Sequence, residues 1–365
     1  MKVALIGFGT AGEARLGAYR PLAGVTVTTV VDPSPARRER ARALDPTVRV
    51  HATLAEHLAT ARQSAAETGA AGAAGAAVEA GDAVDAVDIC TPPVFHRPLT
   101  LEALGAGLHV ICEKPVAFAA ADAEELVAAS RKARRLLYPA HNYAFSPMMR
   151  LLAEVRDEGV LGTPLRASFV IRRATHARGV DGWAPDWRRD PGIAGGGILL
   201  DHGSHCVYLA TRLFGAAPEK VSATVDRAAS PAGAPGTPGA AGVEEAVRAR
   251  LHFAGHTCEI DLSWTSGVRE NAYVLAGPNG RLEIQDGSAV LDAGGTHRAY
   301  ELTSPTRNST HEEWFADMFA DFAASLDDPD RWEAPYAEIL STARVIESAY
   351  RSAERDGSLV GLDET

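Results

Sequence analysis

Apolar positions in the first third of the chain fall into short runs separated by segments of helical character. The runs predict strands at residues 3–6, 25–31, 48–50, 84–89 and 109–112. Helices are predicted directly after residue 12 and at residues 35–43, 54–61, 99–106 and 126–134. Alternation of strand and helix is typical of βαβ units that build a parallel sheet.

The pattern changes from about residue 137. Strand-like runs now follow one another across short turns, at residues 165–171, 220–225, 246–253, 257–263, 272–276 and 280–284. This succession favours antiparallel pairing, and helices at 312–326 and 336–355 close the chain. A chain of 365 residues is expected to form two domains. We place them at 1–137 and 138–365, with the last helices packing back on the first domain.

Two segments carry almost no side chains that can form a core. Residues 64–81 are rich in alanine and glycine, which predicts a mobile insertion or a frayed helix extension. Residues 228–242 are rich in proline, glycine and alanine, which predicts a linker at a hairpin tip. Neither segment is expected to be needed for folding.

Composition excludes several classes of protein. A formal net charge of -11 argues against a nucleic-acid partner, whose phosphates need a basic face. No apolar run reaches about 18 residues and no hydrophobic leader precedes the first strand, so neither a membrane span nor a signal peptide is expected. The cysteines lie far apart without a CxxC pair, which predicts no metal site and no disulfide and fits a reducing cytoplasm. They are Cys90, Cys112, Cys206 and Cys258.

The most informative motif is GFGTAG, residues 7–12, directly after the first strand. In a dinucleotide-binding turn, Gly7 allows the tight turn, Gly9 admits the pyrophosphate and Gly12 lets helix and strand pack closely. The second strand ends at Asp32, whose carboxylate would accept hydrogen bonds from the adenine ribose and repel a 2′-phosphate. This favours NAD over NADP, although Arg37 and Arg38 follow closely and would tolerate a phosphate.

Two further motifs carry candidate chemistry. Glu113–Lys114–Pro115 follows the strand at 109–112, at the carboxyl edge of the sheet where ligands bind, although a surface turn of this sequence is common and, for this motif alone, the more frequent explanation. Three glycines at 195–197 precede a helical segment in which Asp201 and His205, four positions apart, share one face. A carboxylate beside an imidazole supports its protonated form, as a general base requires, although a surface salt bridge also fits.

Aromatic and arginine residues precede the three glycines. Trp183, Trp187 and Arg188 suit stacking on a sugar face and binding its hydroxyls or a carboxylate. A loop pinned by its two tryptophans explains the same residues. His176 and Arg178 give a weaker form of the same indication.

Together, GFGTAG, TPPVFH at 91–96, EKP at 113–115 and GGGILLDHGSH at 195–205 resemble the Gfo/Idh/MocA family. The family takes its name from glucose-fructose oxidoreductase, inositol dehydrogenase and a rhizopine-catabolism oxidoreductase. The resemblance spans nearly the whole chain. It implies an α/β fold with an N-terminal Rossmann dinucleotide-binding domain and a C-terminal α+β domain with a large, mostly antiparallel open sheet. Since one face of that sheet must be covered, a homodimer or homotetramer is expected.

The resemblance also implies roles for single residues. Lys114 corresponds to the family's active-site lysine, and Asp201 and His205 to its Asp-x-Gly-x-His pair with His205 as acid/base. Residues expected to bind the cofactor are Gly7, Phe8, Gly9, Thr10, Ala11, Gly12, Asp32, Pro33, Thr91, Pro92, His96, Glu113, Lys114 and Asn142. Residues expected to bind the substrate are Lys114, Tyr143, Trp187, Arg188, Asp201 and His205. Ala144 stands where the family's N-x-R-F-x-P segment has arginine, so that contact stays open.

The implied activity is NAD-dependent oxidation of a secondary alcohol of a sugar, amino sugar or cyclitol, or reduction of the matching ketone, without a metal. Two alternatives remain within the family. One is a glycosidase that uses NAD for redox-assisted elimination, which forms no net NADH. The other is a non-catalytic dinucleotide-binding regulator, against which the joint presence of Lys114, Asp201 and His205 argues. The Asp–His pair disfavours a linear-ketone or tetrapyrrole reductase.

Overall fold

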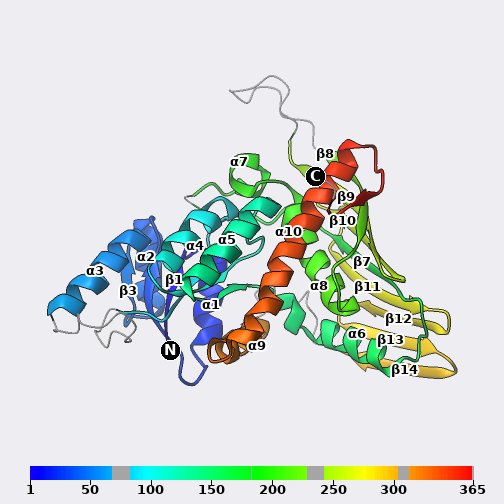
Figure 1. Ribbon diagram of the computed structural model, residues 1–365, viewed down its shortest axis with the longest axis horizontal. Helices are drawn as coiled ribbons and strands as arrows, with labels where there is room; N and C mark the ends of the chain where they lie inside the picture. Colours follow the sequence, from blue (N-terminus) through cyan, green and yellow to red (C-terminus); the bar gives the residue numbers. More distant parts are fainter. Residues whose placement is uncertain (68–82, 182, 228–241, 303–311, 364–365) are drawn as a thin grey trace. The chain divides into compact units, whose positions relative to one another are not determined.

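The structure, a computed structural model, describes residues 1–67, 83–181, 183–227, 242–302 and 312–363 (Figure 1). Most of the two segments predicted to be mobile, 64–81 and 228–242, therefore lies outside the described residues. The chain divides into two compact units. The first comprises Met1–Val116, Glu124–Ala140 and Phe315–Tyr336, and the second Ala117–Ala123, His141–Trp314 and Ala337–Thr365.

The first unit is built on a six-stranded sheet in the order β3-β2-β1-β4-β5-β6, with all neighbours parallel. This is the order of Rossmann folds, in which right-handed crossovers place helices on both faces of the sheet. The strands are β1 (Lys2–Ile6), β2 (Thr26–Val31), β3 (Arg49–His51), β4 (Ala86–Ile89), β5 (His109–Cys112) and β6 (Leu137–Pro139). The predicted parallel sheet is confirmed, and it includes β6, at the position where the sequence pattern changes.

The helices of this part of the chain are α1 (Thr10–Tyr19), α2 (Pro35–Leu44), α3 (Leu54–Glu67), α4 (His96–Gly105), α5 (Ala120–Ala133) and α9 (Glu312–Leu326). Short 3₁₀ turns lie at Pro93–Phe95 and Pro329–Trp332. The helix predicted from residue 99 begins three positions earlier, because Pro98 falls in its first turn, where its missing N–H costs no helical hydrogen bond. The helix predicted to end at residue 61 continues to Glu67.

The second unit contains a nine-stranded sheet in the order β14-β13-β12-β11-β7-β10-β9-β8-β15. Only β7 and β10 pair in parallel, so the predicted mostly antiparallel sheet is confirmed. Its strands are β7 (Arg166–Arg172), β8 (Lys220–Arg227), β9 (Glu244–Phe253), β10 (His256–Ser263), β11 (Glu270–Gly277), β12 (Gly280–Gln285), β13 (Ser288–Ala293), β14 (Thr296–Glu301) and β15 (Val360–Gly361). The last three were not expected from the sequence.

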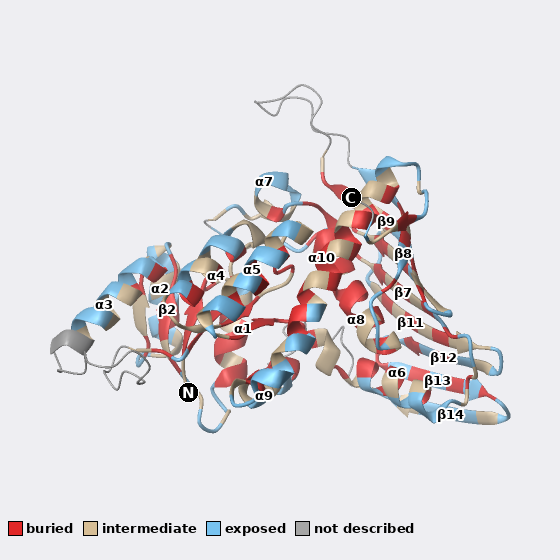
Figure 2. Cartoon of the chain, viewed as in Figure 1, coloured by how far each residue is buried: buried red, intermediate tan, exposed pale blue. Residues whose placement is uncertain are grey.

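Helices cover one face of this second sheet. Side chains of α6 (Pro147–Glu158), α8 (Ser204–Phe214) and α10 (Glu333–Glu354) form one apolar core with the inward residues of β7 to β13 (Figure 1). Buried positions follow the inner sides of these helices and alternate with exposed ones along the strands (Figure 2). The helix α6 was not predicted; Ser146 caps it by accepting a hydrogen bond from the Met149 N–H, and Pro147 is its first residue.

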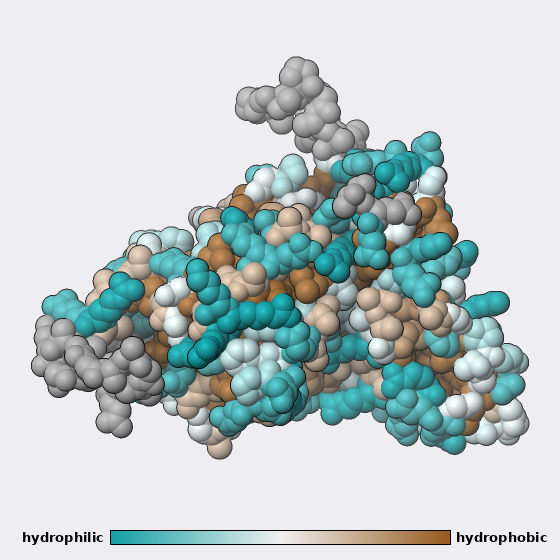
Figure 3. All heavy atoms as spheres, in the orientation of Figure 1, coloured by the Kyte–Doolittle hydropathy of each residue, from teal (hydrophilic) through white to brown (hydrophobic). Residues whose placement is uncertain are grey.

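Hydrophilic residues dominate the face seen in Figure 3, interspersed with smaller hydrophobic groups. Within the described ranges, no helix has the length and apolar character needed to cross a membrane.

Candidate active site

The glycine turn after β1 has a backbone that only glycine fits at two positions. Gly7 has φ +90°, and a Cβ there would lie 2.9 Å from the Thr91 Cγ2 atom. A Cβ at Gly12 would overlap the carbonyl oxygen of Gly7. Gly9 occupies the N-cap of α1, and no side chain caps that helix end. The first amides of α1 are thus suited to a pyrophosphate group, as a dinucleotide requires.

Asp32 lies beside this turn and is only 8% exposed. Its Oδ2 accepts a hydrogen bond from the Phe8 N–H at 2.7 Å, and its Oδ1 accepts one from the Ser34 N–H at 2.8 Å. Each carboxylate oxygen keeps a second lone pair that can accept a ribose hydroxyl. The residues present therefore fit the adenosine end of NAD.

The two arginines that would tolerate a 2′-phosphate are engaged elsewhere. Arg37 forms an ion pair with Glu13 and donates to the Phe8 carbonyl. Arg38 donates to the carbonyl oxygens of Asp32 and Pro33, at 2.7 and 2.9 Å. Their positive charge is directed to protein partners, which agrees with a preference for NAD.

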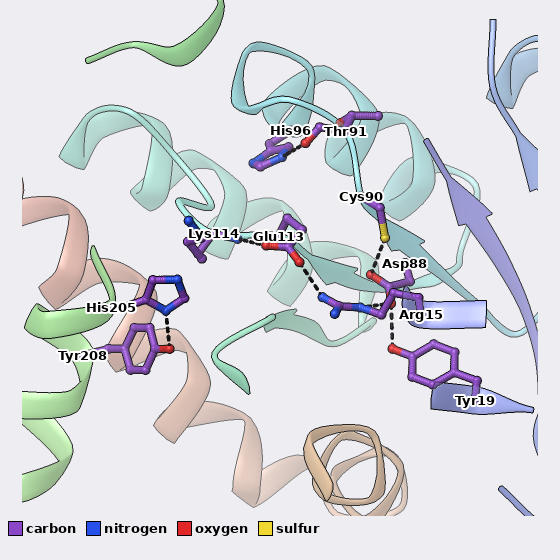
Figure 4. A network of polar contacts seen from close by, with 10 residues as sticks. All are labelled: Arg15, Tyr19, Asp88, Cys90, Thr91, His96, Glu113, Lys114, His205 and Tyr208. Atoms are coloured by element: carbon purple, nitrogen blue, oxygen red, sulfur yellow. Dashed lines mark hydrogen bonds and ion pairs between the residues drawn. The ribbon is translucent and has the colours of Figure 1, made fainter. Parts of the chain in front are cut away.

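The EKP turn is anchored in the interior of the first unit. The Lys114–Pro115 peptide bond is cis. Glu113 accepts from the Arg15 guanidinium at 2.7 Å and from the Lys114 N–H at 3.2 Å. Arg15 is fully buried and also pairs with Asp88 at 2.8 Å (Figure 4). An isolated surface turn would not have such an anchor, and sequence analysis did not single out Arg15.

His96 connects the TPPVFH segment to the same turn. Its Nδ1 lies 2.8 Å from the Pro115 carbonyl oxygen, and its Nε2 lies 2.8 Å from that of Thr91 (Figure 4). Burial lowers the pKa of His96, although the two carbonyl groups act in the opposite direction. The Thr91 hydroxyl is buried and has no hydrogen-bond partner among the described residues. Contacts of Thr91, Pro92 and His96 with a cofactor stay a prediction.

In the second unit, the three glycines before α8 lie against the protein's own side chains. A Cβ at Gly195 would overlap the Phe118 ring, and one at Gly196 the Tyr350 hydroxyl. A Cβ at Gly197 would overlap the carbonyl oxygen of Glu244. The close approach predicted for this loop is therefore explained, at least in part, by packing within the unit.

Glu244 is fully buried and holds the start of the candidate catalytic segment. Its Oε1 accepts from the N–H groups of Gly197 and Leu199 at 2.8 and 3.1 Å, and from the Tyr350 hydroxyl at 2.8 Å. Burial and then the Glu244 carboxylate raise the pKa of Tyr350. Because Glu244 is distant in sequence from the glycines, no local pattern pointed to it.

The turn that carries Asp201 differs from the expected α-helix. Leu199–Gly203 is π-helical, and α8 begins at Ser204. The Asp201 Oδ2 lies 3.4 Å from the Arg188 Nε and 3.3 Å from the His202 Nδ1. Asp201 thus has partners beyond the one that the motif suggested, and its expected role in orienting the imidazole of His205 stays a prediction.

His205 is held by two tyrosines. Its Nδ1 lies 2.6 Å from the Tyr208 hydroxyl oxygen (Figure 4), and its ring centroid lies 4.3 Å from that of Tyr143. The ring of Tyr208 stacks on His141 at 3.8 Å. Burial raises the pKa of both tyrosines, so both hydroxyls stay protonated near neutral pH. Tyr208 is a further residue that sequence analysis did not identify.

Behind this stack, His141 and Asn142 are buried. The His141 Nδ1 lies 2.9 Å from the Glu338 Oε2, and Arg212 forms an ion pair with the same carboxylate. Burial acts to raise the pKa of Glu338, but the hydrogen bond from His141 and the charge of Arg212 lower it. The carboxylate is thus ionised and fixes the ring on which Tyr208 stacks.

Of the residues before the glycines, Trp187 is packed into its own loop. A Cβ at Gly179 would lie 2.8 Å from the Trp187 Cδ1, which supports the interpretation of a pinned loop. Arg188 lies over the Trp187 ring at 4.3 Å and donates to the Ala177 carbonyl at 3.1 Å. Through its ion pair, Arg188 joins this loop to Asp201. Substrate contacts of Trp187 and Arg188 stay a prediction.

Comparison with known proteins gives matches along most of the chain. Residues 1–141 match the model for the oxidoreductase family with an NAD-binding Rossmann fold, and residues 149–283 match the Gfo/Idh/MocA C-terminal domain. The trans-1,2-dihydrobenzene-1,2-diol dehydrogenase of Mus musculus is 35% identical over 205 residues, 54% of this chain and 54% of its own length. The 1,5-anhydro-D-fructose reductase of Ensifer adhaerens is 30% identical over 195 residues, 53% of this chain and 55% of its own.

Solved structures with the same fold extend over the full chain. A levoglucosan dehydrogenase complexed with NADH and levoglucosan has a TM-score of 0.78 at 19% identity and covers 100% of both chains. An inositol dehydrogenase homologue complexed with NAD+ from Azotobacter vinelandii has a TM-score of 0.77 at 19% identity, covering 99% of this chain and 97% of its own. In sequence, the chain spans about half the length of the curated relatives it matches. Since the two family models together match both units, the chain belongs to the Gfo/Idh/MocA oxidoreductase family, and its first unit is an NAD-binding Rossmann domain.

Proposed function

We propose that the protein transfers a hydride between NAD and a secondary alcohol or ketone of a sugar, amino sugar or cyclitol. The observation that carries the proposal is the position of His205, 7% exposed at the start of α8 and bonded through Nδ1 to Tyr208, in a chain with an NAD-binding unit. Curated relatives named as diol dehydrogenase and anhydrofructose reductase support this substrate class.

The chain's residues divide the work of the proposed reaction. NAD, when bound, supplies the hydride acceptor. Because the Nδ1 of His205 is bonded to Tyr208, proton exchange with the substrate hydroxyl falls to Nε2. The Asp201 carboxylate adds negative charge that favours the imidazolium. Lys114 donates to the substrate oxygen and stabilises the negative charge that develops there.

A panel of cyclitols, sugars and amino sugars tests the proposal. Each compound is incubated with the protein and NAD, and NADH is followed by its absorbance. Stoichiometric NADH formation from at least one free polyol is expected. Cleavage of a glycoside without net NADH indicates the elimination mechanism, and NAD binding without turnover of any compound indicates a regulator.

Lys114→Ala provides a matched test of the lysine's role. We expect NAD binding to persist and the rate of NADH formation to fall by roughly 10²–10³-fold, the loss usual for a donor to a developing oxyanion. Lys132→Ala, on the last turn of α5, is the control for loss of a lysine charge. Equal rates in the two variants would contradict the role of Lys114.

A further inference from the structure

An arginine adjoins the end of each of two neighbouring strands of the second sheet, β7 and β11 (Figure 1). The alternation of side chains along the strands places both arginines on the face that the helices cover. Arg173 directly follows β7 and continues the row of inward residues that includes Ile171; it is 9% exposed. β11 pairs antiparallel with β7 and places Asn271 opposite Ile171. Arg269, two residues before Asn271, therefore lies opposite Arg173 on the same face.

Within the described ranges, no carboxylate lies within ion-pair distance of either arginine. Arg172, on the opposite face of β7, pairs with Asp261 at 3.0 Å and Glu270 at 3.2 Å. Arg173 instead donates its Nη1 to the carbonyl oxygens of Arg172 and Glu270, at 2.8 and 3.1 Å. In the described part of the chain, neither Arg173 nor Arg269 forms an ion pair. The cost of burial concerns Arg173, because its guanidinium keeps its charge and a buried charge without an ion pair is costly.

The two charges repel each other. Burial first, and then the charge of Arg269, lower the pKa of Arg173, although the Arg173 guanidinium stays protonated at physiological pH. Adjacent like charges are destabilising, and an anion bound between the two guanidinium groups would relieve their repulsion.

The pair lies beside the candidate catalytic segment. Gly203, in the π-helical turn, packs on Leu262 of β10, and the next residue of β10, Ser263, accepts a hydrogen bond from the Arg173 N–H at 2.8 Å. Arg173 interacts electrostatically with Asp201 and with Tyr143, the ring that contacts His205. The Asp201 carboxylate also forms an ion pair with Arg188, so two guanidinium groups act on this one carboxylate.

A neutral polar atom next to Arg269 also lacks a partner. The Asn271 side chain is 3% exposed, and its Oδ1 is buried without a hydrogen-bond partner among the described residues. Asn271 lines a small recess together with Tyr143 and Asp286. No ion pair in the described residues joins Asp286 to either arginine. A ligand hydroxyl donating to the Asn271 Oδ1 would satisfy this atom.

We propose that Arg173 and Arg269 bind an anionic group of the substrate, which is therefore an acidic polyol. Its chemistry is a sugar or cyclitol that carries a carboxylate or a phosphate, with a hydroxyl placed to donate to Asn271. The guanidinium group suits either oxyanion, because its planar N–H donors form paired, charge-assisted hydrogen bonds. The inference rests on the proposed function, since it adds an anionic group to the substrate of that same site.

The inference is tested by calorimetry, in which each probe is titrated into the whole protein with NADH already bound. The probes are D-glucuronate, D-galacturonate, D-glucose 6-phosphate and D-galactose 6-phosphate, each compared with its neutral parent sugar. We expect at least one acid to bind about ten- to a hundred-fold more tightly than its parent, and added salt to weaken only the acid. Comparison of the two uronates with the two sugar phosphates shows whether the site binds a carboxylate or a phosphate.

Substitutions assign the effect to the two arginines. Arg173→Gln and Arg269→Gln should each remove the preference for the acid, and Arg173→Lys should retain part of it. Arg172→Gln, which removes an arginine from the opposite face of the same strand, is the matched control and should keep the preference. Since Arg269 is exposed, its variant carries the test if Arg173→Gln does not fold. Equal binding of acids and neutral parents, or equal losses in Arg172→Gln and Arg269→Gln, would overturn the inference.

NADH formation measured with the same compounds separates the two proposals. If the protein turns over a neutral sugar, and the arginine substitutions do not change that rate, the proposal of an anionic substrate is wrong and the proposed function stands. Binding of an acid that depends on the arginines, without turnover of any compound, would support the anion site and contradict the proposed function.

Discussion

Replacing Tyr208 with phenylalanine removes one hydroxyl from the imidazole of His205 and keeps an aromatic ring against His141. The hydroxyl oxygen lies 2.6 Å from the His205 Nδ1, and the stacked rings lie 3.8 Å apart. For Nε2 to take a proton, Nδ1 must carry the ring hydrogen and donate it to the Tyr208 oxygen. In the variant, this buried hydrogen loses its acceptor.

The magnitude follows from the hydrogen bond that is lost. A neutral hydrogen bond contributes about 1 kcal/mol, and one to a charged group about 2 kcal/mol. The imidazolium therefore loses about 1 kcal/mol more than the neutral ring, which is equivalent to about 0.7 pH unit. The imidazolium that forms when Nε2 takes the proton is destabilised by this difference of about 1 kcal/mol, which corresponds to a factor of about five in rate. We expect hydride transfer to slow by up to about five-fold, and the acid limb of the pH–rate profile to move about 0.7 unit lower.

The assay is single-turnover NADH formation with saturating NAD and the polyol identified by the panel, across the pH range in which histidine titrates. Tyr336→Phe is the matched control, because Tyr336 is a buried tyrosine of the first unit whose hydroxyl bonds to Ser130 at 2.7 Å. It should leave the profile in place. An unchanged rate and profile in Tyr208→Phe, or a shift to higher pH, would refute the role given to the Tyr208 hydroxyl.

Three further predictions concern other parts of the chain. Asp32→Ser should lower the preference for NAD over NADP, measured as the ratio of kcat/KM values, and efficient use of NADP by the unaltered protein would contradict the role of Asp32. Burial lowers the pKa of His109 to about 4, so the stability that its neutral form contributes above the unfolded pKa of about 6.5 is lost as the pH falls towards 4. After allowance for solvent screening, the free energy of unfolding lost in this way is about 1–2 kcal/mol. Denaturant unfolding at pH 7 and at about 4.5 should therefore show a smaller loss of stability on acidification in His109→Asn than in the unaltered protein. Gly197→Ala places a methyl group on the Glu244 carbonyl oxygen and should destabilise the protein by about 3 kcal/mol, whereas Gly105→Ala, with open space around it, should leave the melting temperature nearly unchanged.

The sequence was sufficient to predict those elements and contacts that depend on residues within one short segment of the chain. The strand His109–Cys112 and the helix Glu312–Leu326 have the predicted bounds, because their apolar positions repeat with the period of one element. The spacing of Gly7, Gly12 and Asp32 is also local to one βαβ unit, and the structure brings these residues together at one turn.

The sequence was insufficient to predict contacts between segments that are distant along the chain, or the conformation of irregular turns. Glu244 supports the segment that begins at Gly197, but nothing between them in the sequence signals the contact. The π-helical turn that carries Asp201 was not predicted, because the spacing of the motif fits an α-helix equally well. Tyr208 is near His205 in sequence, but a tyrosine in an apolar helix face looks like core until its hydroxyl is seen at the imidazole.

In the proposed reaction, His205 exchanges the proton that accompanies hydride transfer. The most direct test is the single-turnover rate of NADH formation by His205→Ala at saturating NAD, with binding of NAD checked separately by titration. We expect a rate lower by roughly 10²–10⁴-fold, with NAD affinity little changed and the acid limb of the pH–rate profile lost; this is the role proposed for His205. A near-normal rate with an unchanged pH profile would contradict it.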